Sequence, residues 1–323
     1  MQQLNEKIDR IRECAGRCLQ EFFKFTVPKV DVDFSNKSEL ACLFISDELE
    51  NDKDNTKVAD DGIAYLPWRS AEFVFHSMKP LFDSDAYSGS ILKGLITSSG
   101  GLTESTLKAS QKSLFEHLSA MGDVKDGEGK RDAAAGIKQK KRFIKKLNSI
   151  MESCHKQDRV TVPLMKTIEN LLTADYLADE EVQEDIAEIH RLAVAECNKS
   201  KNIVKLMAGV GVFAGMLNSP DADLCKKAAK TLLFLLYHNF PKVRKLAAEK
   251  LYTGLLTMES YEAVIPGGED AYDEVNELIS ETDWALEVKV LTAETKVKMY
   301  GYFGHEIKLK EPAAQEPAKE IKS

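Results

Sequence analysis

The sequence has few of the features that mark membrane, secreted or nucleic-acid-binding proteins. No run approaches the roughly 18 apolar residues of a bilayer-spanning helix, so no membrane span is expected. The first residues, MQQLNEKIDR, lack the apolar stretch of a secretion signal. The formal net charge is −8, which argues against a nucleic-acid partner because phosphate binding requires a basic surface.

Cysteine is scarce and scattered. Six cysteines occur in 323 residues without a CxxC pair, and reduced thiols in a cytoplasmic protein are the simplest interpretation. Cys14 and Cys18 are four residues apart and would supply half of a metal site, but no nearby histidine or cysteine pair completes it. We therefore predict neither a metal nor a cofactor.

Signatures of catalysis are missing as well. The sequence has no HExxH, GxSxG or P-loop motif, and its six histidines are far apart. Gly209, Gly211 and Gly215 superficially resemble a dinucleotide fingerprint, but their spacing differs from it and no strand pattern precedes them. Small residues here are expected to allow close helix packing. The sequence predicts a binding protein that is not an enzyme.

The sequence does contain abundant helix-forming patterns, since Gly and Pro number only 18 and 9 while 43% of residues are apolar and 30% charged. Residues 87–118 predict two amphipathic helices joined by a tight turn. The first apolar stripe comprises Ile91, Leu92, Leu95 and Ile96. Gly100 or Gly101 is expected to end the first helix with a positive φ. After Leu102, Thr103 is expected to cap the second helix, with Glu104 in its first turn.

Residues 241–258 form the clearest repeat unit. Pro241 suits a first helical turn, and one face carries Val243, Leu246, Ala247, Leu251 and Leu255. The set Pro241, Val243, Arg244 and Ala247 resembles the second helix of a HEAT repeat, in which the small Ala allows close helix approach and the Arg ties neighbouring repeats together. We predict an all-α, HEAT/armadillo-like α-solenoid of stacked helical hairpins, with roughly five to seven helix pairs.

The domain organisation follows from breaks in these patterns. Residues 1–121 form an N-terminal helical part with an acidic insert near 47–63. Its entry helix, 4–25, is expected to turn Leu4, Ile8, Ile11, Ala15 and Leu19 inward. Residues 122–141 are expected to be a flexible linker, and 142–304 to be the C-terminal HEAT-like repeats. Pro163 is expected to open a helix of these repeats, and Trp284 begins their last helix, 284–302. The polar residues 305–323 are expected to be disordered.

Charge is segregated along the repeats. A basic segment contains seven lysines and arginines, namely Lys226, Lys227, Lys230, Lys242, Arg244, Lys245 and Lys250, while 175–196 contains eight acids. The basic segment is a candidate protein-binding surface that steers an acidic partner. The alternative is that the two segments pair with each other between repeats.

A second basic run covers 138–146, where six of nine residues are Lys or Arg. It is expected to be the solvated face of a helix whose inward residues are Phe143, Ile144, Leu147 and Ile150. The alternatives are a contact with an acidic protein and binding of nucleic acid, which the net charge disfavours.

Several strings resemble one known family. GLITSSGGLTES and QKSLFEHL, within 87–118, resemble the C-terminal region of the tubulin-folding cofactor D family. Three further stretches resemble it in the same order: QQLNEKIDRIRECA at 2–15, RVTVPLMKTIENLLT at 159–173, and FPKVRKLAAEKLYTGLLT at 240–257 followed by ISETDWALEV at 279–288. No single string is a catalytic signature, but their common order extends from about residue 2 to residue 303.

The resemblance implies a non-catalytic tubulin chaperone in the cytoplasm, associated with microtubules. Members of the family capture β-tubulin and act with cofactors C and E on the α/β-tubulin heterodimer, promoting GTP hydrolysis by tubulin. Cofactor C supplies the catalytic arginine, and an Arl-type small GTPase restrains the family. The family's full-length protein is longer, and 51–63 and 122–141 have no clear counterpart in it. A generic HEAT-repeat scaffold for other proteins is the alternative, although generic similarity would preserve only apolar spacing.

Overall fold

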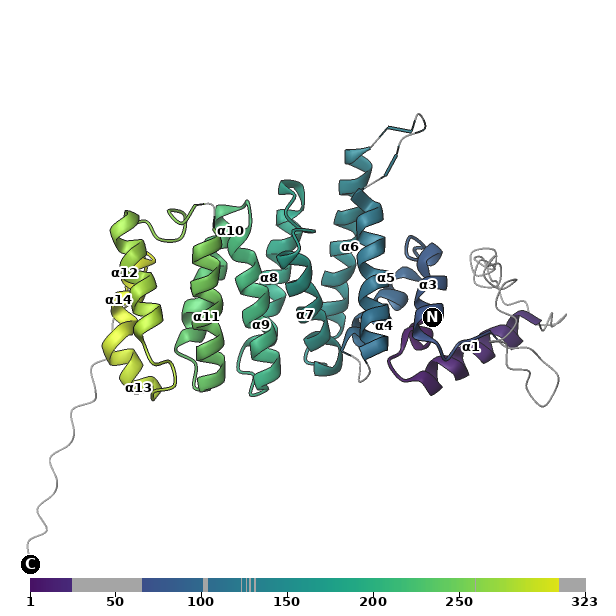
Figure 1. Ribbon diagram of the computed structural model, residues 1–323, viewed down its shortest axis with the longest axis horizontal. Helices are drawn as coiled ribbons and strands as arrows, with labels where there is room; N and C mark the ends of the chain where they lie inside the picture. The colour runs from purple at the N-terminus through teal and green to yellow at the C-terminus, as the bar shows by residue number, and fades with distance from the viewer. Residues whose placement is uncertain are drawn as a thin grey trace, which may run out of the picture.

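The computed structural model is an elongated array of helices that stand side by side across its long axis (Figure 1). It describes residues 1–24, 66–100, 104–122, 132–258 and 260–307, with scattered residues between 123 and 131. The predicted all-α, HEAT/armadillo-like fold is confirmed. The acidic insert near 47–63, the tail beyond 307 and the turn residues Gly101, Leu102 and Thr103 lie outside the described residues.

Helices follow one another closely in the described part of the chain. The N-terminal elements are η1 (Gln2–Asn5), α1 (Asp9–Lys24), α3 (Ala71–Ser77), η4 (Lys79–Leu81), α4 (Ser88–Ser99) and α5 (Glu104–Gly122). The central elements are α6 (Ala133–Ser153), α7 (Asp158–Thr173), η5 (Glu180–Val182), α8 (Gln183–Cys197), α9 (Ile203–Gly215), η6 (Met216–Asn218), α10 (Ala222–Leu236) and α11 (Pro241–Thr257). The C-terminal elements are α12 (Gly268–Glu281), α13 (Val288–Leu291), the π-helical turn η7 (Thr292–Lys296) and α14 (Val297–Tyr302).

From α4 to α11 the helices form two layers. In the first, the α4 layer, α4, α7, α9 and α11 pack successively against one another. In the second, the α5 layer, α5, α6, α8 and α10 do the same. Each of α6, α8 and α10 is followed by a partner in the opposite layer, which is the helical-hairpin repeat of a solenoid. At the start α4 precedes α5, so that α5 and α6 are consecutive within one layer.

The buried apolar side chains of the described residues fall into two clusters that meet in α4. Ile91 and Leu95 belong to an N-terminal cluster built around Trp68 and Phe75. Leu92 and Ile96 belong to a second cluster that continues from α5 to Phe303. The boundary between cores therefore lies in α4. Helix α5, which falls inside the predicted N-terminal part, packs against both α3 and α6, and its buried apolar residues belong to the second cluster.

The predicted inward face of the entry helix is confirmed only in part, because Leu4 is buried and Ala15 and Leu19 pack against the N-terminal cluster. Ile8 and Ile11 are 43% and 36% exposed, whereas Arg12, Gly16 and Gln20 are the buried positions of α1. The guanidinium of Arg12 donates to the carbonyl oxygens of Glu6 and Arg69, at 2.7 and 2.8 Å, and pairs with Asp9. Polar side chains with fixed partners thus occupy buried positions of α1 that the apolar pattern did not identify.

Gly16 lies where α1 approaches Trp68. A Cβ atom at this position would lie 2.1 Å from Cγ of Trp68, a side chain that is 1% exposed and donates through Nε1 to Gln20 at 3.0 Å. We expect Gly16→Ala to lower the free energy of unfolding by about 2 kcal/mol, the usual cost of overpacking a core.

Denaturant unfolding monitored by tryptophan fluorescence measures this effect. Gly301→Ala is the control, because a Cβ atom at Gly301 in α14 would meet nothing within 4 Å, and alanine there is expected to be neutral or slightly stabilising. Equal stability of the two variants would contradict the close approach of α1 to Trp68.

The two helices predicted within 87–118 are confirmed as α4 and α5, and the stripe Ile91, Leu92, Leu95 and Ile96 is buried. Gly101 lies outside the described residues, so the positive φ predicted for Gly100 or Gly101 is tested only at Gly100, where it is wrong. Its φ is −93°, so no left-handed conformation is required of it. Instead, a Cβ atom there would lie 2.9 Å from Cγ of Pro163, and Gly100 allows α4 to approach α7.

Two predicted boundaries also need correction. The flexible linker expected over 122–141 does not extend to residue 141, because α6 begins at Ala133. The carboxylate of Asp132 accepts from the backbone N–H of Ala135 at 2.9 Å and caps this helix. Likewise α7 begins at Asp158, and Pro163 lies within it rather than at its start. The inward residues predicted for α6, Phe143, Ile144, Leu147 and Ile150, are all buried.

Candidate functional site

The basic segment chosen as the candidate binding surface is divided between the two layers. Lys226, Lys227 and Lys230 are exposed on α10, in the α5 layer. Lys242 and Lys245 are exposed on α11, in the α4 layer. We call the first group the α10 patch and the second the α11 patch. Whether either patch binds a protein stays a prediction.

Arg244 is not part of an exposed surface, since it is only 2% exposed. Its Nε donates to the carbonyl of Trp284 at 3.0 Å, and its Nη1 to the carbonyls of His238 and Asn239 at 2.8 and 3.1 Å. Its Nη2 donates to the carbonyls of Ala285 and Leu286. The residue therefore ties the start of α11 to the turn before α13, as its HEAT-like motif predicted, and its inclusion among steering residues was wrong.

The other motif residues surround this contact. Pro241 is the first residue of α11, as predicted, and Val243 and Ala247 are fully buried. Trp284 is buried and donates through Nε1 to the carbonyl of Ile279 at 2.9 Å. It does not begin a helix, because the helix predicted over 284–302 starts at Val288. Val243, Ala247 and Trp284 are thus part of the packing of the last repeats, whereas Pro241 is exposed.

Lys250 is engaged within the array. Its Nζ lies 2.8 Å from Oε1 of Glu169, which joins α11 to α7 across α9. Gly211 of α9 makes room for this pair, because a Cβ atom there would lie 2.1 Å from the carboxylate of Glu169. The prediction that the glycines of α9 serve close packing is confirmed, and the ion pair links three successive repeats.

In the described part of the chain, no ion pair joins the acidic segment, 175–196, to the basic one. Lys250 pairs with Glu169 and Lys226 lies 3.9 Å from Asp223, neither of which belongs to that segment. Asp179 instead pairs at 2.5 Å with Lys140 of α6. Part of the basic run over 138–146 therefore connects neighbouring repeats, while Lys138, Arg142 and Lys145 are exposed.

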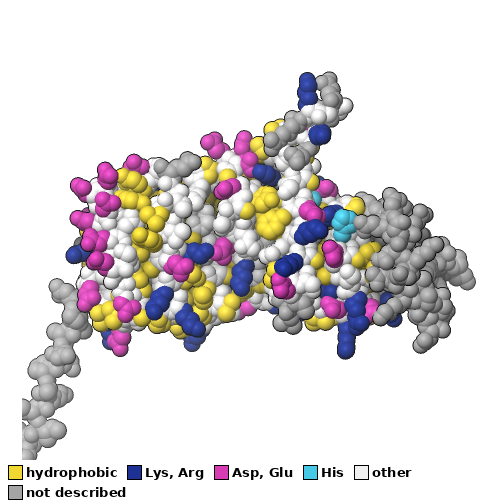
Figure 2. All heavy atoms as spheres, in the orientation of Figure 1, with side chains coloured by type: hydrophobic (Ala, Val, Ile, Leu, Met, Phe, Trp, Pro, Cys, Tyr) yellow, Lys and Arg dark blue, Asp and Glu magenta, His cyan; other side chains and the backbone are white. Residues whose placement is uncertain are grey.

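The C-terminal end of the array is acidic. Figure 2 shows Asp and Glu side chains gathered over this end. Six exposed acids belong to α12, namely Glu269, Asp270, Asp273, Glu274, Glu277 and Glu281. The α12 end thus differs in charge from the lysine patches of the two preceding helices, which gives an acidic partner a preferred side of approach.

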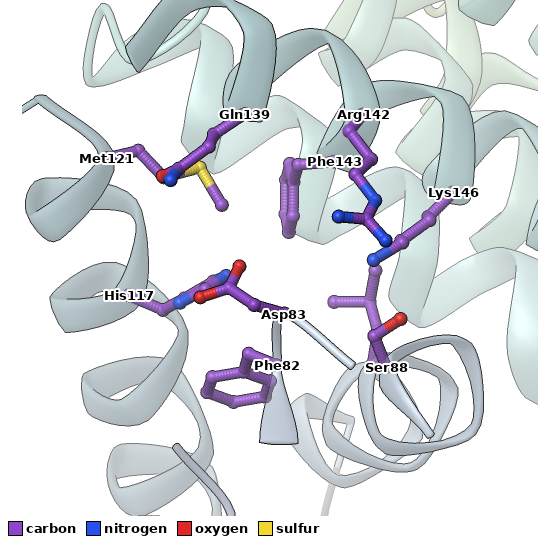
Figure 3. A pocket seen from close by; sticks show the side chains of 10 residues that line it. Phe82, Asp83, Ser88, His117, Met121, Gln139, Arg142, Phe143 and Lys146 are labelled. Carbon is purple, nitrogen blue, oxygen red and sulfur yellow. The ribbon is translucent and has the colours of Figure 1, made fainter. Parts of the chain in front are cut away.

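A pocket lies near the other end of the array, between the segment that leads into α4, helix α5 and helix α6 (Figure 3). It encloses about 190 Å³. Its apolar wall comprises Phe82, Leu92, Met121 and Phe143, all of them buried. Figure 3 shows Arg142, Lys146 and Ser88 along one side, and Asp83 beside His117 on the other.

The polar side chains of the pocket are incompletely paired. The hydroxyl of Ser88 is buried and makes no hydrogen bond with the described residues. Arg142 pairs with Asp85, whose side chain is 89% exposed. Burial, and then the charge of Arg142, lowers the pKa of Lys146. Burial also lowers the pKa of His117, whose imidazole lies 4.5 Å from the ring of Phe82, centroid to centroid, in a tilted arrangement.

A buried charged cluster lies where α7, α8 and α9 meet. Nζ of Lys205 lies 2.7 Å from Oε2 of Glu196 and also pairs with Asp158, the first residue of α7. The other oxygen of Glu196 accepts from the backbone N–H of Lys156 at 2.7 Å. Every charge has a partner, which is the arrangement of a structural cluster.

Sequence reasoning did not find the pocket. Its polar side chains come from three separated segments and share no motif, although Lys146 and Arg142 fall within the second basic run. Among the described residues no three His, Cys, Asp or Glu side chains gather as metal ligands would, and no helix there is long and apolar enough to cross a membrane.

The chain matches a known family. A family model described as the tubulin folding cofactor D C-terminal region matches residues 1–205. No solved structure matches the chain. The strings noted at 240–257 and 279–288 lie beyond the matched residues and stay a resemblance.

Proposed function

Because the chain belongs to the tubulin folding cofactor D family, whose C-terminal model it matches, we propose that it binds β-tubulin during assembly and disassembly of the α/β-tubulin heterodimer. The family match over residues 1–205 is the observation that carries this proposal. In this proposed role the chain acts in the cytoplasm, in association with microtubules, and contributes binding energy without catalysing a reaction.

The other partners follow from the same family role. Cofactors C and E join the complex, where they promote GTP hydrolysis by tubulin, and an Arl-type small GTPase restrains it. A helical array suits this role, because a solenoid offers an extended surface and repeats that shift slightly against one another. Binding can then change as tubulin changes state, provided that the two states differ in their contacts with the array.

Size-exclusion chromatography tests the proposal. The chain is mixed with tubulin, and separately with cofactor E and with an Arl-type GTPase. Co-elution with tubulin is the expected result. Co-elution with none of them would contradict the proposal and favour the generic scaffold for other proteins.

The lysine patches provide a sharper test of how tubulin approaches. We expect Lys226→Glu with Lys230→Glu, in the α10 patch, to slow tubulin association several-fold at low salt and to have little effect at high salt. The matched control is Lys242→Glu with Lys245→Glu in the α11 patch. It reverses the charge of the same number of exposed lysines, but in the other layer. Stopped-flow association rates that are unchanged for both variants at low salt would remove electrostatic steering from the proposal.

A further inference from the structure

The pocket between α4, α5 and α6 has the composition of a site for a single anionic side chain. Its polar side carries Arg142 and Lys146, and its wall is formed by the rings of Phe82 and Phe143 together with Leu92 and Met121. A space of about 190 Å³ accepts one side chain rather than a folded surface. A ligand that fits both sides has an aliphatic stem and a charged end.

Ser88 gives an independent indication of a ligand. Its side chain is 2% exposed, and its Oγ has no hydrogen-bond partner in the described part of the chain. Buried hydroxyls are rarely left unpaired, because each missing hydrogen bond costs free energy. Ser88 is also the first residue of α4, where the positive end of the helix dipole favours an anion. The pocket thus lacks an acceptor at this point.

The charge distribution sets where the anion would lie. Asp83 is beside His117, on the side of the pocket opposite Lys146 (Figure 3), and excludes a carboxylate from that side. Arg142 already pairs with one carboxylate, that of Asp85, which does not line the pocket. That side chain is 89% exposed, so the pair contributes little to stability and an incoming carboxylate can replace it.

We propose that this pocket binds a glutamate or aspartate side chain from an acidic peptide segment of a protein partner. Lys146 and the hydroxyl of Ser88 donate to the carboxylate, Arg142 adds a second cation, and Phe143 with Met121 contacts the stem. The inference does not depend on the identity of that partner, and its failure would leave the tubulin proposal intact.

Fluorescence anisotropy with a labelled hexaglutamate peptide tests the assignment on the full chain, with hexaglutamine as the uncharged probe. Lys146→Met keeps the length and apolar character of the side chain and removes its charge. We expect it to weaken hexaglutamate binding about ten-fold, the effect of losing one charge-assisted hydrogen bond. Lys138→Met is the matched control on the same helix, since Lys138 is exposed and outside the pocket, and it should change affinity less than about two-fold.

Two further variants separate binding from stability. Ser88→Ala removes an unpaired buried hydroxyl, so it should weaken peptide binding several-fold while leaving the melting temperature equal or higher. Asp83→Asn removes the opposing charge and should tighten binding about three-fold. A merely structural role of these residues would not produce opposite effects on affinity and stability.

Several outcomes would overturn the proposal. Equal weakening by Lys146→Met and Lys138→Met would mean that the peptide is held by diffuse surface charge. Undetectable hexaglutamate binding at low salt would mean that the pocket takes no carboxylate. Inorganic phosphate, added at a concentration equal to the total concentration of peptide carboxylates, is the last probe. Displacement of the peptide by this phosphate would mean that the pocket binds a free anion.

Discussion

Replacing Arg244 by methionine is expected to lower the free energy of unfolding by about 3 kcal/mol or more, the usual cost of removing one side of a buried polar network. The guanidinium donates to carbonyl oxygens on both sides of the junction between α11 and the turn at Trp284. Methionine fills a similar volume but donates nothing, so these carbonyls would be left buried without partners.

Urea unfolding followed by circular dichroism measures the loss. Lys245→Met is the control, because Lys245 is the next residue of α11 and is exposed, and its replacement should change stability by less than about 0.5 kcal/mol. Arg244→Lys should recover little, since an ammonium cannot reproduce the planar fork that reaches several carbonyls. If Arg244→Met unfolds at the same urea concentration as the unaltered chain, the junction is held by its apolar contacts alone.

Replacing Lys205 by methionine is expected to cost about 3 kcal/mol, because it leaves the buried carboxylate of Glu196 with only the His155 ring and the Lys156 N–H as partners. Lys205 and Glu196 are 4% and 3% exposed. The double variant Lys205→Met with Glu196→Gln should recover part of this loss, since it removes both charges. A double variant no more stable than the single one would show that the cluster stabilises through other contacts. Lys201→Met is the control for the loss of a lysine, because Lys201 is exposed and lies just before α9.

The same cluster predicts how stability depends on pH. Burial alone would raise the pKa of Glu196, but the hydrogen bonds from Lys205 and from the Lys156 N–H lower it overall. The hydrogen bond from Lys205, and next that from Asn202, lowers the pKa of Asp158. Carboxyl groups with lowered pKa values stabilise the fold above their ordinary pKa of about 4 and lose that contribution as the pH falls through the lowered values.

Lys205 sets the upper limit of the pH range in which the cluster stabilises the fold. Burial opposes its charge, yet its hydrogen bonds to Asp158 and Glu196 raise its pKa overall. Its contribution is complete below its ordinary pKa of about 10.4 and is lost as the pH rises through the raised value. The free energies of unfolding of the unaltered chain and of Lys205→Met, measured between pH 3 and 7, should converge at the acid end, because the carboxyl groups of Glu196 and Asp158 become protonated there. Parallel curves would contradict the lowered carboxyl pKa values.

Sequence reasoning was most accurate where apolar spacing alone determines the structure. The stripes of α4 and α6 recur at helical intervals, and their residues are buried as predicted. It was wrong where a polar residue faces inward. In α1 the buried positions include Arg12 and Gln20, whose partners Arg69 and Trp68 lie about fifty residues later, and no local pattern reveals such a contact.

Arg244 illustrates the same limit in one residue. Its place in a HEAT-like motif predicted a tie between repeats, while its lysine-rich neighbours predicted a surface charge. Both readings were consistent with the sequence, and the decision depends on whether the carbonyls near Trp284 reach it. The pocket was missed for a related reason, because Ser88, His117 and Lys146 become neighbours only when α4, α5 and α6 pack together.

The position of α4 between two cores has a consequence for motion. Its residues Ile91 and Leu95 pack toward the N-terminal cluster, and Leu92 and Ile96 toward the repeats. If α1 and α3 detach, α4 loses the cover of one side but keeps that of the other, so it stays folded on the repeats. The amide hydrogens of α3 should then exchange with solvent through a partial opening that needs less free energy than global unfolding. The amide hydrogens of α4 should exchange with solvent only when the repeats themselves unfold.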